Sequence, residues 1–285
     1  MLNSYTHRPT LSQASAALTH DVEVVDERGR RSTIAIPAER PLTVYVDKRE
    51  LVTLMTLGGA PEALTLGYLR NQRLVRAIDE IESVQVDWSV DAVAVVTRNG
   101  IADVEERTAK KVVTTGCGQG SVFGGLMDEI DQITLPAAAR LQQSVIYKIV
   151  DTIRTQNSIY KQAGSVHGCA LFTSSGELLH FFEDVGRHNA VDAIAGRMWL
   201  EDIAGGDKVF YTTGRLTSEM VMKGAQMGIP FLLSRSGTTQ MGHMVAERVG
   251  MSLLSRCSGK HFLVLSGQER IVFEPALLEV APRVF

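Results

Sequence analysis

The sequence predicts an α/β protein (α+β overall), in which a small α+β domain precedes a larger α/β domain. From about residue 135 onward, helical and strand patterns alternate, as is typical of layered α/β structures. Between residues 21 and 113, short apolar runs surround a single predicted helix. Residues 116–120 contain three glycines and separate the two regions. We therefore predict a mobile tail (1–20), an α+β domain (21–113), a glycine-rich loop and linker (114–134) and an α/β domain (135–285).

The first domain is predicted mainly from strand patterns. Its one helix, 63–73, follows Pro61 and Glu62, which suit a first helical turn. Asn99-Gly100 is a turn signal. The residues before position 21 lack the basic start and apolar core of a secretory signal. The predicted strands are 22–25, 34–36, 42–46, 83–88 and 92–97.

The second domain is predicted to alternate helices with strands. Gly228 and Gly250 suit the left-handed position that follows a helix. The predicted helices are 137–162, 190–200, 218–227 and 240–249. The predicted strands are 165–173, 178–183, 208–213, 230–234, a strand around Leu253, and 262–265, with a turn at 174–177.

Composition excludes several classes of function. The chain has 45% hydrophobic and 21% charged residues, as expected for a globular protein. A net charge of -3 gives no basic field for nucleic acid, and no apolar stretch is long enough to span a membrane. Three cysteines, an odd number, do not indicate a disulfide framework. The sequence therefore predicts a protein of the reducing cytoplasm.

Three predicted strand-to-helix loops, 185–189, 212–218 and 234–239, each combine Gly and Arg with small polar residues. Free N–H groups at helix starts and arginine guanidinium groups both suit phosphate. For any one loop, helix capping alone is the better explanation. Three such loops favour a large anionic ligand with a nucleotide-like tail. The candidate contacts are Arg187, His188, Arg215, Ser218, Ser236 and Thr238.

Two other polar clusters do not indicate catalysis or metal binding. Glu183-Asp184 beside Arg187-His188 is interpreted as an ion-paired helix start rather than an acid/base pair. The stretch His167-Gly168-Cys169 lacks the Glu of the zinc deaminase H-x-E motif, and the chain has no P-C-x-x-C. No metal site is predicted.

Cys117 lies in the glycine-rich loop, where an exposed, mobile thiol would suit sulfur transfer. A surface cysteine without a role explains the loop equally well. Cys169 lies in a predicted buried strand, whereas Cys257 fits either a core or a loop position.

Three segments together identify a family resemblance. They are LVTLMTLGGAPEALTLGYLRNQRLV, SVHGCALFTSSGELLHFFEDVGRHNAVDAIAG and YTTGRLTSEMVMKGAQMGIPFLLSRSGTT. Between about residues 40 and 274, the chain resembles the formate dehydrogenase accessory sulfurtransferases, the FdhD family. The resemblance implies that Cys117 accepts persulfide sulfur from a cysteine desulfurase. It also implies delivery of that sulfur to the molybdenum bis-guanine-dinucleotide cofactor of the formate dehydrogenase catalytic subunit.

Further expectations follow from the same resemblance. The second domain is expected to be cytidine-deaminase-like without zinc, and the protein is expected to be a homodimer. A carboxy-terminal cofactor-binding segment of the family falls on Arg256, Cys257, Ser258, Gly259, Lys260 and His261.

One departure from the family concerns the cysteine loop. The family pattern C-G-x-C-G has Gly120 here in place of its second cysteine, so a disulfide within the loop is impossible. Persulfide transfer needs only one sulfur-bearing residue.

A chaperone that binds the cofactor without transferring sulfur is the alternative, and a zinc-dependent nucleoside deaminase is a third hypothesis.

Overall fold

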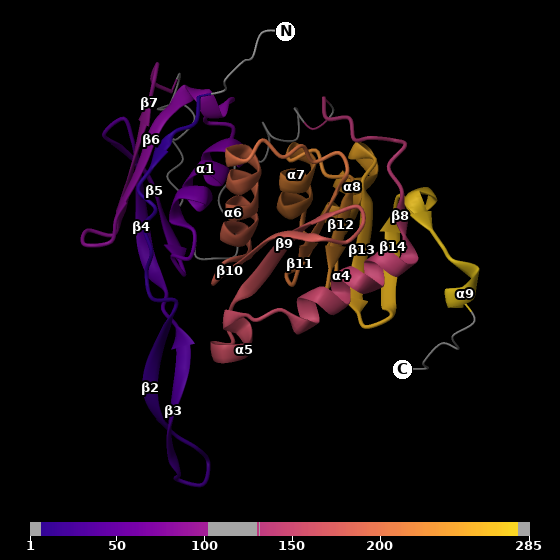
Figure 1. Cartoon of the computed structure of the whole chain (residues 1–285), viewed down its shortest axis with the longest axis horizontal. Helices are drawn as coiled ribbons and strands as arrows, with labels where there is room; N and C mark the ends of the chain where they lie inside the picture. The colour runs from indigo at the N-terminus through magenta and orange to yellow at the C-terminus, as the bar shows by residue number, and fades with distance from the viewer. Residues whose placement is uncertain (1–6, 102–129, 131, 279–285) are drawn as a thin grey trace. The chain divides into compact units, whose positions relative to one another are not determined.

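The computed structural model describes residues 7–101, 130 and 132–278 (Figure 1). The chain divides into two compact units that interleave along the sequence. Unit 1 contains Met1–Gly125, Asn157–Cys169 and Phe182–Ile203, and unit 2 contains Leu126–Gln156, Ala170–Phe181 and Ala204–Phe285. The predicted persulfide residue, Cys117, lies outside the described residues. Residues 157–169 and 182–203 were predicted in the second domain, but they belong to unit 1.

Unit 1 is built on a five-stranded mixed sheet in the order β1-β6-β7-β4-β5. A separate two-stranded ribbon, β2–β3, continues beyond this sheet in Figure 1. The helices are α1 (Pro61–Asn71), the short α5 (Ile159–Ala163) and α6 (Arg187–Leu200). The strands are β1 (Thr10–Leu11), β2 (Thr19–Val25), β3 (Arg31–Pro37), β4 (Arg40–Val46), β5 (Arg49–Thr56), β6 (Ile81–Asp87) and β7 (Ala92–Thr97).

Strand β5 was not predicted, whereas strands were predicted at the positions of β2, β3, β4, β6 and β7. It forms a hairpin with β4 through Asp47 and Lys48, whose φ angles are 48° and 71°. Two-residue turns of this kind are usually Asn-Gly or Asp-Gly. Because Lys48 stands where Gly is preferred, the turn signal between the two strands is incomplete.

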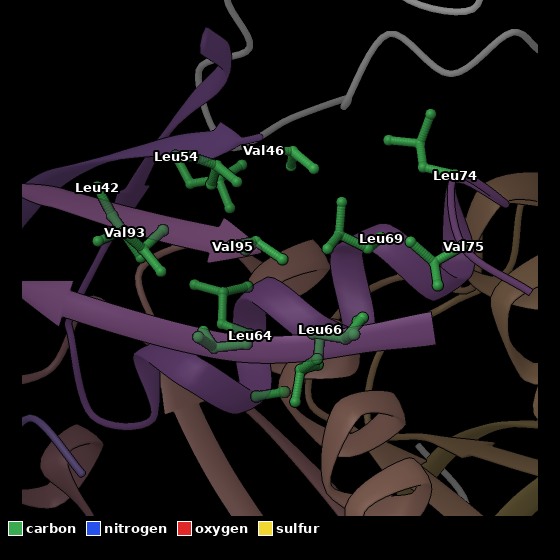
Figure 2. Close-up of a cluster of buried hydrophobic side chains, with 14 residues drawn as sticks. Leu42, Val46, Leu54, Leu64, Leu66, Leu69, Leu74, Val75, Val93 and Val95 are labelled. Atoms are coloured by element: carbon green, nitrogen blue, oxygen red, sulfur yellow. The ribbon is translucent and has the colours of Figure 1, made fainter. Parts of the chain in front are cut away.

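The core of unit 1 lies between the five-stranded sheet and α1. Alternate residues of the strands, such as Leu42 and Val95, are buried and face Leu64, Leu66 and Leu69 of the helix (Figure 2). The period-two pattern of the strands and the helical spacing of the leucines therefore meet in one apolar cluster.

Helices α1 and α6 cross at very short range. A Cβ atom added to Gly67 would lie 1.7 Å from the carbonyl oxygen of Asp192. A Cβ atom added to Gly196 would lie 1.9 Å from the carbonyl oxygen of Ala63. Reciprocal glycines thus allow the two backbones to touch, and this contact joins α6 to unit 1.

Part of the segment 1–20, which was predicted as a mobile tail, makes contacts within unit 1. Thr10 pairs with Ser83 of β6 in parallel register. The Ser12 hydroxyl and the Ala14 N–H both donate to the Glu62 carboxylate, at 2.7 and 2.6 Å. These contacts could not be predicted, because a two-residue strand and a carboxylate 50 residues away form no local pattern.

Unit 2 contains most of a six-stranded sheet in the order β10-β9-β11-β12-β13-β14. The strands are β9 (His167–Thr173), β10 (Leu178–Asp184), β11 (Lys208–Thr212), β12 (Phe231–Ser234), β13 (Ser252–Ser258) and β14 (His261–Ser266). The helices are α4 (Gln143–Thr155), α7 (Ser218–Gln226), α8 (Gln240–Val249) and α9 (Pro275–Leu278). Short strands β8 (Leu141–Gln142) and β15 (Ile271–Val272) pair with each other.

Helices cover both faces of this sheet. Ile146 and Ile149 of α4 belong to a buried cluster with Phe172, Tyr211 and Leu233 of the strands. On the opposite face, Gly224 of α7 lies directly against Leu232. This arrangement confirms the predicted mixed α/β class.

The predicted helix 137–162 is divided in the structure. It corresponds to β8, α4 and α5, with a break after Thr155. Ser158 begins α5 by accepting a hydrogen bond from the Lys161 N–H, a typical amino-terminal cap. The polar cap therefore starts a new helix, although the apolar spacing alone suggested continuity.

Candidate functional site

Three parallel strands of unit 2 end at one edge of its sheet. β11 pairs with β12 and β12 with β13 in parallel, with Thr212 opposite Ser234. The segments that follow the ends of these strands therefore meet. We define the carboxyl edge as residues 213–218, 235–239 and 256–261. It contains all the predicted ligand residues of unit 2, which are Arg215, Ser218, Ser236, Thr238, Arg256, Cys257, Ser258, Gly259, Lys260 and His261.

Hydrogen bonds connect the segments of the carboxyl edge. The Leu216 N–H donates to the Gly237 carbonyl at 3.0 Å, and the Thr239 N–H donates to the Leu216 carbonyl at 3.1 Å. The Arg256 N–H donates to the Ser236 carbonyl at 2.9 Å. Loops that are 20 residues apart in the sequence thus form one connected backbone.

Two helices begin at this edge. Thr217 precedes α7, and the Thr239 hydroxyl accepts from the Gly242 N–H in the first turn of α8 at 3.1 Å. A Cβ atom on Gly242 would lie 2.4 Å from the Leu216 carbonyl oxygen, so glycine allows α8 to approach this loop. The two helix starts direct partial positive charge toward the same edge.

The carboxyl edge is also basic. Arg215, Arg235, Arg256 and Lys260 are exposed there, and segments 212–218, 234–240 and 255–261 contain no acidic residue. The whole chain nevertheless has a net charge of -3. The positive charge of these segments is therefore a local feature of the edge.

A bulge in β13 separates Arg256 from Cys257. The pairing of β13 with β14 shifts register between Ser255 and Ser258, and Arg256 has a φ of 53°. The bulge leaves Arg256 exposed at the edge, while the Cys257 side chain is 1% exposed. Bulges commonly redirect a side chain in this way.

Cys257 was predicted to contact the ligand, but its side chain faces the core. It packs in the cluster that contains Tyr211, Leu233 and Leu254. Burial raises the pKa of the Cys257 thiol to about 12. Cys169 is also fully buried, with its sulfur 3.9 Å from the Arg187 carbonyl oxygen.

Arg187 and His188, the other predicted ligand contacts, lie in unit 1. They form the first turn of α6 and are 5% and 2% exposed. The three loops with Gly and Arg therefore divide between the two units, two in unit 2 and one in unit 1.

The neighbouring Asp184 is held by uncharged donors, which corrects the predicted ion pair at this residue. Its carboxylate accepts from the Thr56 hydroxyl, from the Leu57 and Gly186 N–H groups, both at 3.1 Å, and from the Asn189 amide at 2.9 Å. Burial raises the pKa of Asp184, and the hydrogen bonds act in the opposite direction. Glu183 accepts from the Ile159 and Tyr160 N–H groups that begin α5. Both carboxylates thus accept hydrogen bonds that hold neighbouring backbone in place.

Ser234 and Arg235 lie in the predicted loop 234–239 but were not among the candidate contacts. Ser234 belongs to a recurring pattern in which the last residue of a strand accepts from the N–H two positions later. The same bond occurs at Thr56, Asp184 and Thr212, with donor–acceptor distances of 3.1 Å, and at Ser234 with 2.9 Å. A polar residue that ends an apolar run, followed two positions later by Gly or Ser, is the signal that identifies these strand ends.

In the part of the chain that the structure describes, no three His, Cys, Asp or Glu side chains gather as a metal ion would require. No helix there has the length and apolar content of a membrane span.

These features define an α/β protein with a basic sheet edge. Comparison with known proteins assigns the chain to a family. Residues 37–272 match the model of the FdhD/NarQ family, and the chain belongs to this family.

Several curated relatives carry the name sulfur carrier protein FdhD. The relative from Sulfurisphaera tokodaii is 32% identical, with 83% of this chain and 91% of the relative aligned. The relative from Saccharolobus solfataricus is 30% identical, with 88% and 96% aligned. A solved structure, described as a formate dehydrogenase accessory protein from Desulfotalea psychrophila, superposes with a TM-score of 0.71. It is 26% identical, and the match covers 89% of this chain and 98% of that one.

Proposed function

We propose that this protein is a sulfur carrier for formate dehydrogenase and that Cys117 bears the sulfur. Beyond the family assignment, the burial of the other two cysteines supports this proposal. The chain has three cysteines, of which Cys169 and Cys257 are 0% and 1% exposed. A sulfur carrier must present its thiol to both a donor and an acceptor. Cys117 therefore remains as the candidate.

The proposed donor is the persulfide of a cysteine desulfurase. The Cys117 thiolate attacks the terminal sulfur of that persulfide, the S–S bond of the donor breaks, and the donor leaves as a thiolate. The new bond leaves a terminal sulfur on Cys117. This step needs one thiol in the loop, so Gly120 in place of a second cysteine does not prevent it.

The proposed acceptor is the molybdenum bis-guanine-dinucleotide cofactor of formate dehydrogenase, which is cargo for this protein. Its diphosphate-linked nucleotide arms match the chemistry of the carboxyl edge. Arg215, Arg256 and Lys260 supply positive charge there, while the α7 and α8 starts supply N–H donors. Ser218, Ser236, Thr238, Ser258, Gly259 and His261 lie beside these groups and are proposed as further contacts.

The remaining predictions belong to the same proposal. Arg187 and His188 remain predictions as ligand-binding residues. We also propose a cytidine-deaminase-like architecture for the α/β region, a homodimer and a cytoplasmic location, in keeping with the family resemblance.

The decisive experiment is an intact mass measurement after incubation with a cysteine desulfurase and free cysteine. We expect wild-type protein to gain the mass of one sulfur, a reductant to reverse the gain, and Cys117→Ala to show none. Cys257→Ala is the matched control, since it removes a buried thiol and should leave the gain intact. A gain that persists in Cys117→Ala would contradict the assignment.

A chaperone that binds the cofactor without transferring sulfur is the second candidate. Gly120, in the position of the family's second loop cysteine, is the observation that favours it. This candidate predicts no added sulfur in either protein and full activation of formate dehydrogenase by Cys117→Ala.

A further inference from the structure

Ser234 occupies a central position beneath the carboxyl edge. It is the last residue of β12 and is 0% exposed, so its hydroxyl contacts protein groups rather than solvent. We infer that Ser234 is a positioning residue that sets the relative placement of Arg215, Arg235 and Arg256. The inference rests on the proposed function of the carboxyl edge as a binding site for an anionic ligand.

The Ser234 hydroxyl joins two loops of the edge. It donates to the Gly214 carbonyl at 2.6 Å and accepts from the Ser236 N–H at 2.9 Å. Gly214 directly precedes Arg215, and Ser236 directly follows Arg235. The hydroxyl therefore fixes the backbone beside an arginine in each loop.

The third arginine is connected through the next peptide group. The Ser236 carbonyl accepts from the Arg256 N–H at 2.9 Å. A shift of Ser236 therefore moves the backbone of Arg256 as well. The Arg235 N–H, in turn, donates to the Thr212 carbonyl at 3.1 Å, which ties the same loop to the end of β11.

Loss of this hydroxyl has a defined consequence. Ser234→Ala removes the partner that the Gly214 carbonyl and the Ser236 N–H share, which is unfavourable because the position of the Ser234 hydroxyl is 0% exposed. The loops then adjust to find other partners, and the arginines lose their common arrangement. In metal sites, the groups that orient the ligands contribute about tenfold to a hundredfold to affinity, and we expect an effect at the lower end of that range here.

Ser266 provides a matched control within unit 2. It ends β14 at the opposite edge of the sheet, is 4% exposed, and its hydroxyl donates to the Met251 carbonyl at 2.8 Å. Ser266→Ala removes the same group, with similar burial and the same kind of acceptor. Its effect on stability should resemble that of Ser234→Ala, but the carboxyl edge is untouched.

The test measures the affinity of the full-length protein for guanosine diphosphate by calorimetry, well below the unfolding temperature of each variant. We expect Ser234→Ala to weaken binding about tenfold or more and Ser266→Ala to change it less than about twofold. With Arg215, Arg235 and Arg256 all replaced by Ala, the further loss from Ser234→Ala should largely disappear, because Ser234 acts through those side chains.

The outcomes separate this inference from the function on which it rests. If the wild-type protein binds guanosine diphosphate and Arg256→Ala weakens binding, but Ser234→Ala behaves like Ser266→Ala, the positioning role is wrong and the binding site stands. An effect of Ser234→Ala that is equally large in the arginine-free background also overturns the positioning role. If the wild-type protein does not bind guanosine diphosphate, the ligand role of the carboxyl edge fails, and this inference fails with it.

Discussion

At the residue scale, burial distinguishes the cysteines chemically. Burial raises the pKa of Cys257 to about 12, so at pH 8 only about one molecule in ten thousand carries its thiolate. Cys169 is fully enclosed by protein atoms. Since the thiolate is the reactive form, both residues should be inert in the folded protein.

Alkylation tests this difference directly. With iodoacetamide at pH 8, we expect the native protein to acquire one modification, at Cys117. Denaturation in urea should expose all three cysteines. Native Cys117→Ala should acquire none, and rapid modification of Cys257 in that variant would show that the core around β13 opens.

Asp184 predicts a specific dependence of stability on pH. Because burial raises its pKa, ionisation of this carboxyl costs more in the folded protein than in the unfolded chain. Its contribution to the stability of the folded state therefore falls as pH rises from the unfolded pKa, about 3.9, through the higher folded pKa.

Comparison with Asp184→Asn isolates this effect. The hydrogen bonds lost in the variant give an offset that is independent of pH, whereas the titration occurs only in the wild type. We expect the stability of the wild type minus that of the variant, measured by urea unfolding, to decrease between pH 4 and pH 7. An increase over this range would mean that the four hydrogen bonds outweigh burial and lower the pKa.

At the element scale, the contact between α1 and α6 depends on two glycines. Gly→Ala normally favours a helix by about 1 kcal/mol. At Gly67 or Gly196, however, the added Cβ would lie within 2 Å of a carbonyl oxygen of the other helix. The helices must then separate, and overpacking of this kind costs about 1–3 kcal/mol or more.

We therefore expect Gly67→Ala and Gly196→Ala to lower the free energy of unfolding by about 1–3 kcal/mol, measured in urea. Gly59→Ala is the control in the same unit, since its Cβ would meet Leu18 at an ordinary 3.6 Å. If either helix substitution stabilises the protein, the close crossing is wrong.

The elements themselves were largely predictable, whereas their partners were not. Helices 218–227 and 240–249 were predicted within one residue because apolar spacing and a terminal glycine are local signals; Gly250 adopts the expected left-handed φ of 66°. The α6 sequence, by contrast, resembles any other helix of an α/β domain. Its assignment to unit 1 depends on Gly196 meeting Gly67, a contact between residues more than 100 positions apart.

In the candidate site, too, local features could be predicted from the sequence and long-range contacts could not. The loops 212–218 and 234–239 were predicted from composition, since Gly, Arg and hydroxyl residues before a helix are a visible pattern. The inward position of Cys257 was not predictable because it depends on a bulge at Arg256, and φ > 0 at an arginine has no sequence signal.

At the scale of the whole molecule, charge is distributed unevenly. The chain has 32 acidic and 29 basic residues. Nevertheless, the carboxyl edge contains Arg215, Arg235, Arg256 and Lys260 without an acidic neighbour in its segments. An overall negative protein with a local basic edge attracts anions to that edge without binding polyanions along its whole surface.

This distribution predicts that binding of guanosine diphosphate depends on one edge and not on total charge. We expect Arg256→Glu to weaken binding about tenfold to a hundredfold, because a charge-assisted contact is replaced by repulsion. Arg28→Glu makes the same change in net charge at the exposed turn between β2 and β3 and should have little effect. Affinity should also fall as salt rises from 0.05 to 0.5 M, less steeply in Arg256→Glu. Equal losses in the two variants would mean that the net charge of the molecule, rather than the carboxyl edge, governs binding.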